Sequence, residues 1–516
     1  MRRPLLVLAL ILASFISGPV VSRAAAAPAA VPRYTPTTCP KIAGIDWLDR
    51  ATCGYLVVPE NRSKQNGRTI QLMITKISAR SAEKQPDPIL YLEGGPGDIA
   101  QLEADQIIKA PFLRDRDIWL VSQRGTWSSK PALICAATNA FTQKLLGMRY
   151  YSEATERAHV AATRTCRNEL IATGADLSAY NSSESADDLA DLRKVLGISE
   201  WNVFANSYGT YMAQTLMRAH PEGIRSVVMD SVVPATYTVP GNWWNARYGF
   251  QNLFNACAAQ TACNAAHPHL ERTFTALVNK LEAHPLLPTI VDPYTKKNVP
   301  VVIDGGALID WLRNQTYGLQ TLAAAPATIG GLAAGQHDAI ETVALHRAGR
   351  APEYHPGAVA LGDGLTFGVT CREDYPFATQ EGLAAAGRGA FPNYPASIQR
   401  EAVGSWAYVN EDCGVWNVPT APMAMRQPVA SSIPTLLISG TFDTLTSLAW
   451  AKAAATRLSH STIISIPGVG HSVSAWSPCA RAVVDSFYAA PDREPDTSCV
   501  DKLKPAPFTL TVGEKS

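Results

Sequence analysis

Short apolar runs, separated by helical patterns and turns, constrain the fold of this chain more than any other feature of its sequence. Such runs are typical of strands buried in a sheet, and the helices between them make the crossovers that parallel strands need. The sequence therefore predicts an α/β fold with a mostly parallel central sheet. The expected strands are residues 54–59, 69–77, 88–94, 117–123, 201–206, 224–232, 434–440 and 461–468.

The strand pattern disappears between Val233 and about Pro428. This stretch is rich in Ala and helical in pattern, and it is interrupted by Pro and Gly. Because strand signals resume at 434, we expect residues 234–428 to be a helical cap inserted into a core made of 27–233 and 429–516. A separate helical domain is the alternative.

The first 26 residues have the pattern of a signal peptide. Arg2 and Arg3 precede the apolar run Leu5–Ile16, and the small residues at 24–27 offer a cleavage site. The apolar run is short for a permanent membrane anchor. We therefore expect a secreted or periplasmic protein without a stable membrane anchor, and a retained anchor is the alternative.

The cysteines and the charge agree with export and exclude one class of partner. An even number of cysteines, 10 in all, fits an oxidising compartment. A formal net charge of +1 leaves no basic excess to neutralise phosphates, so we do not expect nucleic acid as a partner. Sequence alone does not fix the connectivity, but the order of the cysteines suggests Cys39–Cys53, Cys135–Cys166, Cys257–Cys263, Cys371–Cys413 and Cys479–Cys499.

The stretch NVFANSYGTY (202–211) has the pattern of a strand, a sharp turn at Ser207 and a helix. A nucleophile elbow needs small residues around its serine, because the backbone is strained and the helix passes close to the strand. Gly209 is one such residue, whereas Ala205 stands where the familiar G-x-S-x-G pattern has glycine. A serine in such a turn can also be an ordinary helix N-cap. The stretch alone leaves the choice open.

The stretch YLEGGPG (91–97) follows an expected strand and precedes a loop. Its glycines allow backbone N–H groups to turn toward a developing oxyanion. We expect Gly94 and Gly95 to provide a donor there. The N–H of Tyr208, the residue after the serine, is the expected second donor.

Asp443 and His471 each lie just beyond an expected strand, in the loops LLISGTFDTLTS and ISIPGVGHSV. The order Ser207, Asp443, His471 is the order of the α/β-hydrolases, and the interval between acid and histidine has room for one helix and one strand. A lone residue at a strand end means little, but three in this order with an oxyanion loop predict a Ser–His–Asp triad.

These motifs together resemble those of a secreted member of the proline iminopeptidase and tripeptidyl aminopeptidase family of serine exopeptidases. The resemblance rests on EGGPG, SQRGT (122–126), ANSYGTY, SGTFDTLTS and GVGHS, and it covers most of the chain outside the signal peptide and the middle of the cap. It implies an α/β-hydrolase fold with an inserted cap and a C-terminal part like that of tripeptidyl aminopeptidases.

The chain departs from the family pattern at three positions. Glu93 stands where the family often has His, Ser122 where it has Asp, and Ala205 where it has Gly. None of these changes removes a backbone donor or a triad side chain, so we expect the chemistry to be retained. The departures bear on substrate specificity.

An exopeptidase must also bind the α-ammonium group of its substrate, most simply with carboxylates where cap and core meet. Glu373 and Asp374 in VTCREDYPF are the candidates, beside a predicted disulfide at Cys371. A similar Cys-x-x-Asp stretch occurs in tripeptidyl aminopeptidase-like sequences. A solvated acidic turn is the alternative interpretation.

The sequence therefore predicts an exported serine hydrolase that works without a metal or cofactor. The leading hypothesis is an aminopeptidase, expected as a monomer, that releases single residues or short peptides such as tripeptides from free N-termini. An esterase or amidase acting on small molecules with the same triad is the first alternative. A non-catalytic binding module with this fold is the second.

Overall fold

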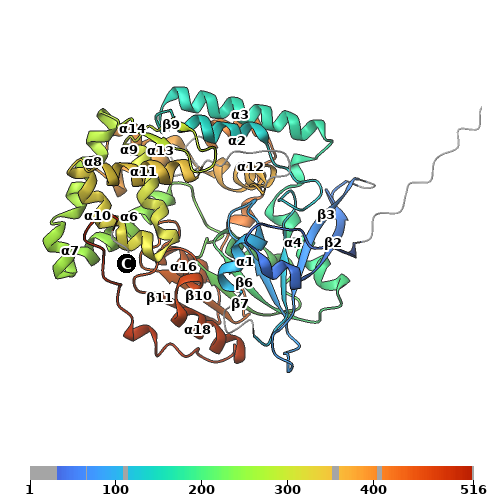
Figure 1. Ribbon diagram of the computed structural model, residues 1–516. Coiled ribbons are helices and arrows are strands. Elements are labelled where there is room, and N and C mark those ends of the chain that lie inside the picture. The colour runs from blue at the N-terminus through green and yellow to red at the C-terminus, as the bar shows by residue number, and fades with distance from the viewer. Residues whose placement is uncertain are drawn as a thin grey trace, which may run out of the picture.

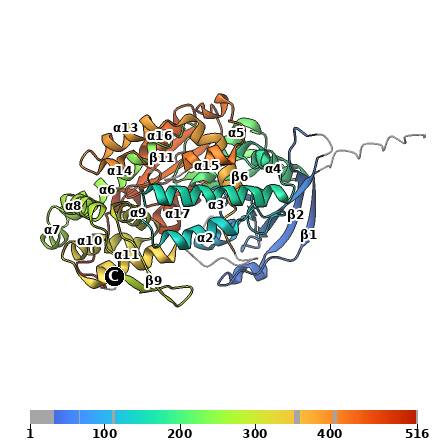
Figure 2. The ribbon, with the colours of Figure 1, turned by 90° about the horizontal axis from the view of Figure 1, so that it is seen from above.

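The computed structural model describes residues 32–64, 67–108, 114–350, 359–401, 403 and 409–513. The expected signal peptide, residues 1–26, lies outside the described residues. The described chain forms a central sheet with helices on both faces and a second group of helices to one side (Figures 1 and 2).

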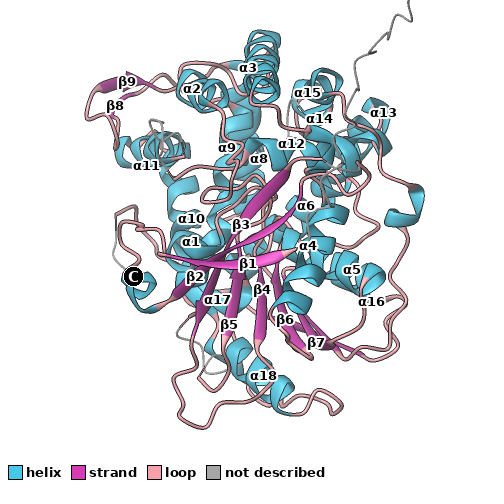
Figure 3. Ribbon diagram, turned by 90° about the vertical axis from the view of Figure 1, so that its right-hand side faces the viewer, coloured by secondary structure: helices cyan, strands magenta, loops and turns pink. Residues whose placement is uncertain are grey.

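Nine strands of the described chain form one sheet in the order β1-β2-β3-β5-β4-β6-β7-β10-β11. Figure 3 shows the twist of this sheet. The pairs β1–β2, β2–β3 and β3–β5 are antiparallel, and every pair from β5 to β11 is parallel. All the expected strands form, which confirms the mostly parallel sheet, and only β1 was not expected. The strands are β1 Arg33–Thr37, β2 Thr52–Pro59, β3 Thr69–Ile77, β4 Ile89–Leu92, β5 Ile118–Val121, β6 Trp201–Asn206, β7 Ile224–Asp230, β10 Thr435–Gly440 and β11 Ser461–Ile466.

The central strand β6 shows why these runs become buried strands. All its residues are buried, because helices cover both faces of the sheet. Val203 and Ala205 face one apolar cluster, whereas Phe204 faces another, as the alternation of side chains along a strand requires. The helices beside the sheet are α1 Ala100–Ile107, α4 Ser182–Val195, α5 Tyr208–Ala219, α16 Leu448–Ala455, α17 Val473–Trp476 and α18 Pro478–Ala489.

The parallel strands bring their carboxyl ends to one edge of the sheet. Leu92 at the end of β4 lies opposite Ala205, and Asn206 at the end of β6 lies opposite Asp230 at the end of β7. The chain leaves β10 and β11 at the same edge. Loops at this edge of an α/β sheet are where such folds place their sites.

The region between β7 and β10 is mainly helical, as the sequence predicts, but it is not free of strands. β8 Thr289–Val291 pairs with β9 Asn298–Pro300 around a turn in which Asp292 accepts from backbone N–H groups. Three residues per strand are too few for a periodic signal, so the sequence did not reveal this hairpin. The helices are α6 Gly241–Ala259, α7 Thr261–Ala266, α8 Leu270–Ala283, α9 Gly305–Asn314, α10 Leu319–Ala333, α11 His337–Gly349, α12 Asp363–Val369, α13 Gln380–Ala390, α14 Ala396–Gln399 and α15 Val409–Trp416.

The helical layer is larger than the predicted insertion 234–428. Helices α2 Ala136–Leu145 and α3 Glu153–Ala172 lie beside cap helices (Figure 2), and Phe141 packs in the apolar cluster of the cap. Phe508 near the C-terminus packs in the same cluster. The predicted boundaries do not include these segments, because the sequence shows a helix but not the surface on which it packs.

The cysteine pairing suggested by their order is confirmed. All five disulfides are present: Cys39–Cys53, Cys135–Cys166, Cys257–Cys263, Cys371–Cys413 and Cys479–Cys499. Three of them lie in the helical layer: Cys135–Cys166 joins the start of α2 to α3, Cys257–Cys263 joins α6 to α7, and Cys371–Cys413 joins the segment directly after α12 to α15. None of the helices in the described ranges is both long and apolar enough to cross a bilayer.

Candidate active site

Ser207 lies in a strained turn between β6 and α5. Its backbone has φ 51° and ψ −123°, a conformation that residues other than glycine rarely adopt. The Ser207 N–H donates to the Asp230 carbonyl oxygen at 2.9 Å, and the Ser207 carbonyl oxygen accepts from the Thr210 N–H at 2.9 Å. Its side chain makes no capping bond to α5, so the helix N-cap alternative does not explain the residue.

The glycine after Ser207 is required by close contact between backbones. A Cβ added at Gly209 would clash with the carbonyl oxygen of Leu92 and lie 2.8 Å from that of Glu93. Helix α5 therefore packs directly on the end of β4, where the glycine loop begins. Ala205, by contrast, is accommodated with its methyl group fully buried.

Asp443 and His471 come together at the carboxyl edge of the sheet. The Nδ1 atom of His471 lies 2.9 Å from Oδ2 of Asp443, so Nε2 is the ring nitrogen that does not bond to this carboxylate. The side chains are almost fully buried, with Asp443 0% and His471 1% exposed. Thr446 donates from Oγ1 to Asp443 Oδ2 at 2.6 Å and thereby orients the carboxylate.

The electrostatics favour an ionised Asp443. Burial acts to raise the pKa of this carboxyl group, but the charge of His471 and the hydrogen bonds from His471 and Thr446 outweigh it, and the net pKa is lowered. An ionised, oriented carboxylate beside Nδ1 is what holds a histidine in one tautomer.

The loop that carries His471 is fixed by a residue of the cap. The His471 N–H donates to the Thr316 carbonyl oxygen at 3.0 Å and lies 2.8 Å from Thr316 Oγ1. Thr316 lies in η4 Gln315–Tyr317, directly after α9, and its Oγ1 also lies 3.3 Å from the carbonyl oxygen of Phe442, next to Asp443. One cap residue thus contacts both loops of the acid–base pair.

A buried aspartate fixes the other side of the same loop. Asp230, at the end of β7, accepts from the N–H groups of Val473 and Ser474 at 2.9 and 2.7 Å. These are the first residues of α17, so the carboxylate lies at the positive end of a short helix. Burial raises the pKa of Asp230 despite these bonds.

The glycine loop differs in one detail from the expectation. The Gly94 N–H donates to Glu93 Oε1 at 2.6 Å, so it is directed at a side chain and not toward Ser207. Glu93 is buried, and the Tyr91 hydroxyl donates to its other oxygen. Gly94 contributes close packing instead, because an added Cβ would lie 2.5 Å from the Ser207 Cβ atom. Gly95 is then the candidate donor in this loop.

Two cavities meet this edge of the sheet. The larger, about 490 Å³, is lined by Ser207 and His471 together with Glu93, Asp98 and Arg350. The smaller, about 100 Å³, is lined by residues that include the following: Tyr208, Tyr211, Tyr237, Arg313, Asp374 and Trp450. Since Tyr208 follows Ser207 directly, the small cavity adjoins the elbow.

The two candidate ammonium ligands have different surroundings. Asp374 is half-buried and lines the small cavity. Glu373 is 1% exposed and accepts from Ser182 N–H at 2.8 Å and Ser182 Oγ at 2.6 Å. The Ser182 hydroxyl also lies 2.8 Å from the Tyr208 hydroxyl. Glu373 therefore supports the wall of the cavity, and the expectation that it binds an ammonium group is not supported.

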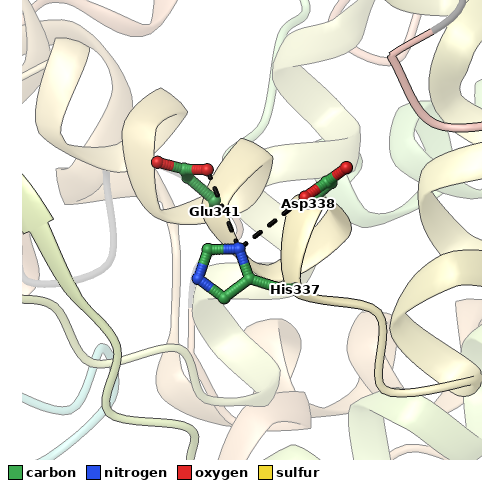
Figure 4. Close-up of side chains that lie close together, drawn as sticks. All are labelled: His337, Asp338 and Glu341. Atoms are coloured by element: carbon green, nitrogen blue, oxygen red, sulfur yellow. Dashed lines mark ion pairs between the residues drawn. The ribbon is translucent and has the colours of Figure 1, made fainter.

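The described residues contain one group of side chains close enough together to hold a metal ion. His337, Asp338 and Glu341 lie at the start of α11, with His337 Nδ1 3.7 and 3.9 Å from the two carboxylates (Figure 4). All three are exposed, and exposed acidic groups of this kind are common on protein surfaces. They provide no ligand to either cavity.

Sequence reasoning missed Thr316 and Arg313, and it missed the role of Asp230. A carboxylate at the end of a strand was a usable signal for Asp230, because strand ends converge at one edge of the sheet. Thr316 and Arg313 had no local signal. Arg313 lies in α9 and Thr316 directly after it, so the packing of this helix on the sheet places both residues at the site.

A strained strand–serine–helix turn, followed along the chain by an acid and a histidine after later strands of a mostly parallel sheet, defines an α/β-hydrolase. The glycine loop beside the serine agrees with this class.

Comparisons with known proteins agree with this class. The family model of TAP-like proteins matches residues 400–499. Tripeptidyl aminopeptidase of Streptomyces coelicolor is 28% identical over 208 residues, which are 37% of this chain and 38% of that protein. Serine protease Hip1 of Mycobacterium tuberculosis is 25% identical over 228 residues, which are 42% of this chain and 43% of that protein. The chain thus matches less than half the length of these two peptidases.

Solved structures align over more of the chain at low similarity. A proline iminopeptidase of Mycobacterium smegmatis aligns with 85% of this chain and 98% of its own, with a TM-score of 0.37 and 13% identity. A serine hydrolase of Cycloclasticus zankles aligns with 85% of this chain and 98% of its own, with a TM-score of 0.34 and 12% identity.

The close packing at Gly209 makes a prediction about the elbow. Gly209→Ala should separate α5 from β4, displace Ser207 and lower kcat/KM about 100-fold, as a displacement of about 1 Å can do. Ala205→Gly removes one buried methyl group, so it should cost about 1 kcal/mol of stability and leave kcat/KM largely intact. Steady-state kinetics and thermal unfolding of both variants check this, and equal kinetic losses would contradict it.

The contact between Thr316 and His471 makes a second prediction. Thr316→Val keeps the shape of the side chain but removes Oγ1, so it should lower kcat about tenfold, the cost of about one buried hydrogen bond. KM should change little, because Thr316 does not line either cavity. Thr316→Ser restores the hydroxyl and should recover most of kcat. A serine variant as slow as the valine variant would mean that packing, not the hydrogen bond, matters here.

Proposed function

We propose that this chain is an exported serine aminopeptidase that releases single residues or short peptides, such as tripeptides, from free N-termini. One observation carries the proposal: a strained serine and the histidine of a buried His–Asp pair line one cavity, and a carboxylate lines the cavity that adjoins it. The similarity to tripeptidyl aminopeptidase supports the choice of peptides as substrates.

The reaction is an acyl transfer in two steps. His471 Nε2 takes the Ser207 hydroxyl proton as Oγ attacks the scissile carbonyl carbon, and it then gives that proton to the departing amine. Water, deprotonated by the same histidine, attacks the resulting ester, and His471 returns the proton to Ser207 Oγ as the ester bond breaks and the N-terminal product leaves. Asp443 stabilises the imidazolium that forms in each step, without taking up the proton itself.

The negative charge on the carbonyl oxygen needs backbone donors. In this proposal they are the N–H groups of Tyr208 and Gly95. Gly209 and Gly94 allow the close packing that brings the two donor segments together.

The α-ammonium group of the substrate is assigned to Asp374. This carboxylate accepts no hydrogen bond from the described residues, and it lines the cavity beside Tyr208. An ammonium group would therefore meet an available acceptor of opposite charge. An esterase or amidase that uses the same triad remains the second candidate, because the large cavity does not by itself require a free amine.

A substrate pair separates these two candidates. The free-amine and N-acetylated forms of one aminoacyl or tripeptidyl chromogenic amide differ only at the group assigned to Asp374. We expect kcat/KM to favour the free amine by at least about tenfold, the value of about one hydrogen bond between charged groups. Asp374→Asn should abolish the preference, whereas Glu373→Gln, assayed at a pH where Asp374 is ionised, should affect both forms alike. Equal turnover of both forms by the unmodified protein would favour the esterase or amidase.

The same preference should depend on pH. Burial, and then the negative charge of Glu373, raise the pKa of Asp374 well above its ordinary value, although Arg426 acts in the opposite direction. As the pH is lowered, Asp374 therefore becomes protonated at a higher pH than an ordinary carboxyl group. The protonated form no longer carries the charge that binds the substrate's ammonium group. The ratio of kcat/KM for free and acetylated substrates should fall as pH falls through this raised pKa. It should also fall above about pH 8, where the α-amine loses its charge.

Taking the ratio of the two substrates removes every pH effect on the catalytic steps that both substrates share. In Asp374→Asn the acid side of this profile should be flat. A profile of the ratio that is the same in the variant and in the unmodified protein would show that Asp374 is not the titrating group.

A further inference from the structure

The small cavity beside Tyr208 contains a second charged group that the mechanism above does not use. Arg313, near the end of α9, is 5% exposed and lines this cavity. No hydrogen bond or ion pair joins its guanidinium group to the described part of the chain, and its buried Nε atom has no partner there.

A buried guanidinium group without a partner is costly to fold. Two other buried arginines, Arg116 and Arg124, donate to acceptors from every nitrogen of the guanidinium group. Arg124, for example, donates to both oxygens of Asp188 and to the carbonyl oxygens of Glu60 and Ala179. A ligand in the cavity that carries a hydrogen-bond acceptor would supply the partner that Arg313 lacks among the described residues.

Asp374 does not neutralise Arg313 directly. No ion pair joins the two side chains, although both line the same cavity of about 100 Å³. The other nearby arginine, Arg426, donates to the carbonyl oxygens of Glu373 and Tyr237 and is held in place by them. The cavity thus offers one positive and one negative group, and neither has a hydrogen-bond or ion-pair partner among the described residues.

We infer that this cavity binds an N-terminal residue with an acidic side chain, with its α-ammonium group on Asp374 and its side-chain carboxylate on Arg313. This inference rests on the aminopeptidase function proposed above and deepens it by naming the residue released first. A neutral N-terminal residue can satisfy Asp374 but leaves the charge of Arg313 unbalanced. A carboxylate balances it and forms charge-assisted hydrogen bonds, which are stronger than those to a neutral carbonyl group.

Matched substrates test this assignment. Chromogenic amides with N-terminal Glu or Gln, and with Asp or Asn, have nearly the same shape and differ in charge. They are prepared as single-residue amides and as tripeptidyl amides, so that the length released does not decide the outcome. The acidic member of each pair should have a kcat/KM at least about tenfold higher in the unmodified protein.

Variants assign the preference to Arg313. Arg313→Met should reduce the Glu/Gln ratio to about one, and Arg313→Lys should retain part of it because the charge stays. Arg388→Met is the matched control, because Arg388 is an exposed arginine of α13 outside both cavities, and it should keep the full ratio. Labelling of each variant by a serine-reactive fluorophosphonate shows that its site is intact.

The outcomes distinguish the two proposals. A Glu/Gln ratio near one in a protein that prefers free amines would overturn the role of Arg313 and leave the aminopeptidase proposal standing. A ratio that survives in Arg313→Met would also overturn it. Equal turnover of free and acetylated substrates would instead remove the aminopeptidase proposal, on which this inference rests.

Discussion

The backbone N–H of His471 meets two oxygens of Thr316, and the rest of the site depends on this contact between cap and sheet. The sheet alone places the loops after β6, β10 and β11 at one edge. Those loops still need a fixed conformation, and the cap provides part of it. Asn245 of α6 donates to the carbonyl oxygen of Leu445 at 2.7 Å, and Thr444 donates to that of Arg313 at 2.7 Å. The cap therefore helps to shape the acid–base pair as well as to enclose it.

Buried carboxylates are the second feature that connects fold and chemistry. Asp443 is kept ionised by His471 and its hydrogen bonds, whereas burial raises the pKa of Asp230 and Asp374. These pKa differences follow from the surroundings of each carboxylate. Asp443 contacts a histidine, Asp230 contacts two N–H groups at the start of a helix, and Asp374 faces a cavity. Glu93, which stands where related sequences often have His, accepts from the Gly94 N–H and so helps to shape the glycine loop. Similar side chains thus serve separate functions at one edge of the sheet.

Much of this could be predicted from the sequence, because strands and nucleophile elbows have local signals. The buried strands appear as apolar runs, and the elbow appears as a serine between a strand and a helix with Gly209 behind it. The five disulfides could be suggested by order along the chain. The positions of Thr316, Arg313 and Glu373 could not, because they depend on how cap helices pack on the sheet. Gly94 shows the same limit, since the glycine was visible in the sequence but the direction of its N–H was not.

The central claim is that Ser207 carries the acyl group of a substrate with a free N-terminus. The most direct measurement is to mix the protein with an aminoacyl or tripeptidyl ester, quench in acid within the first turnover, and map the adduct by mass spectrometry. We expect one acyl group, with its amine free, on the peptide that contains Ser207, and no adduct in Ser207→Ala. An adduct on another residue, or turnover that persists in Ser207→Ala, would contradict it.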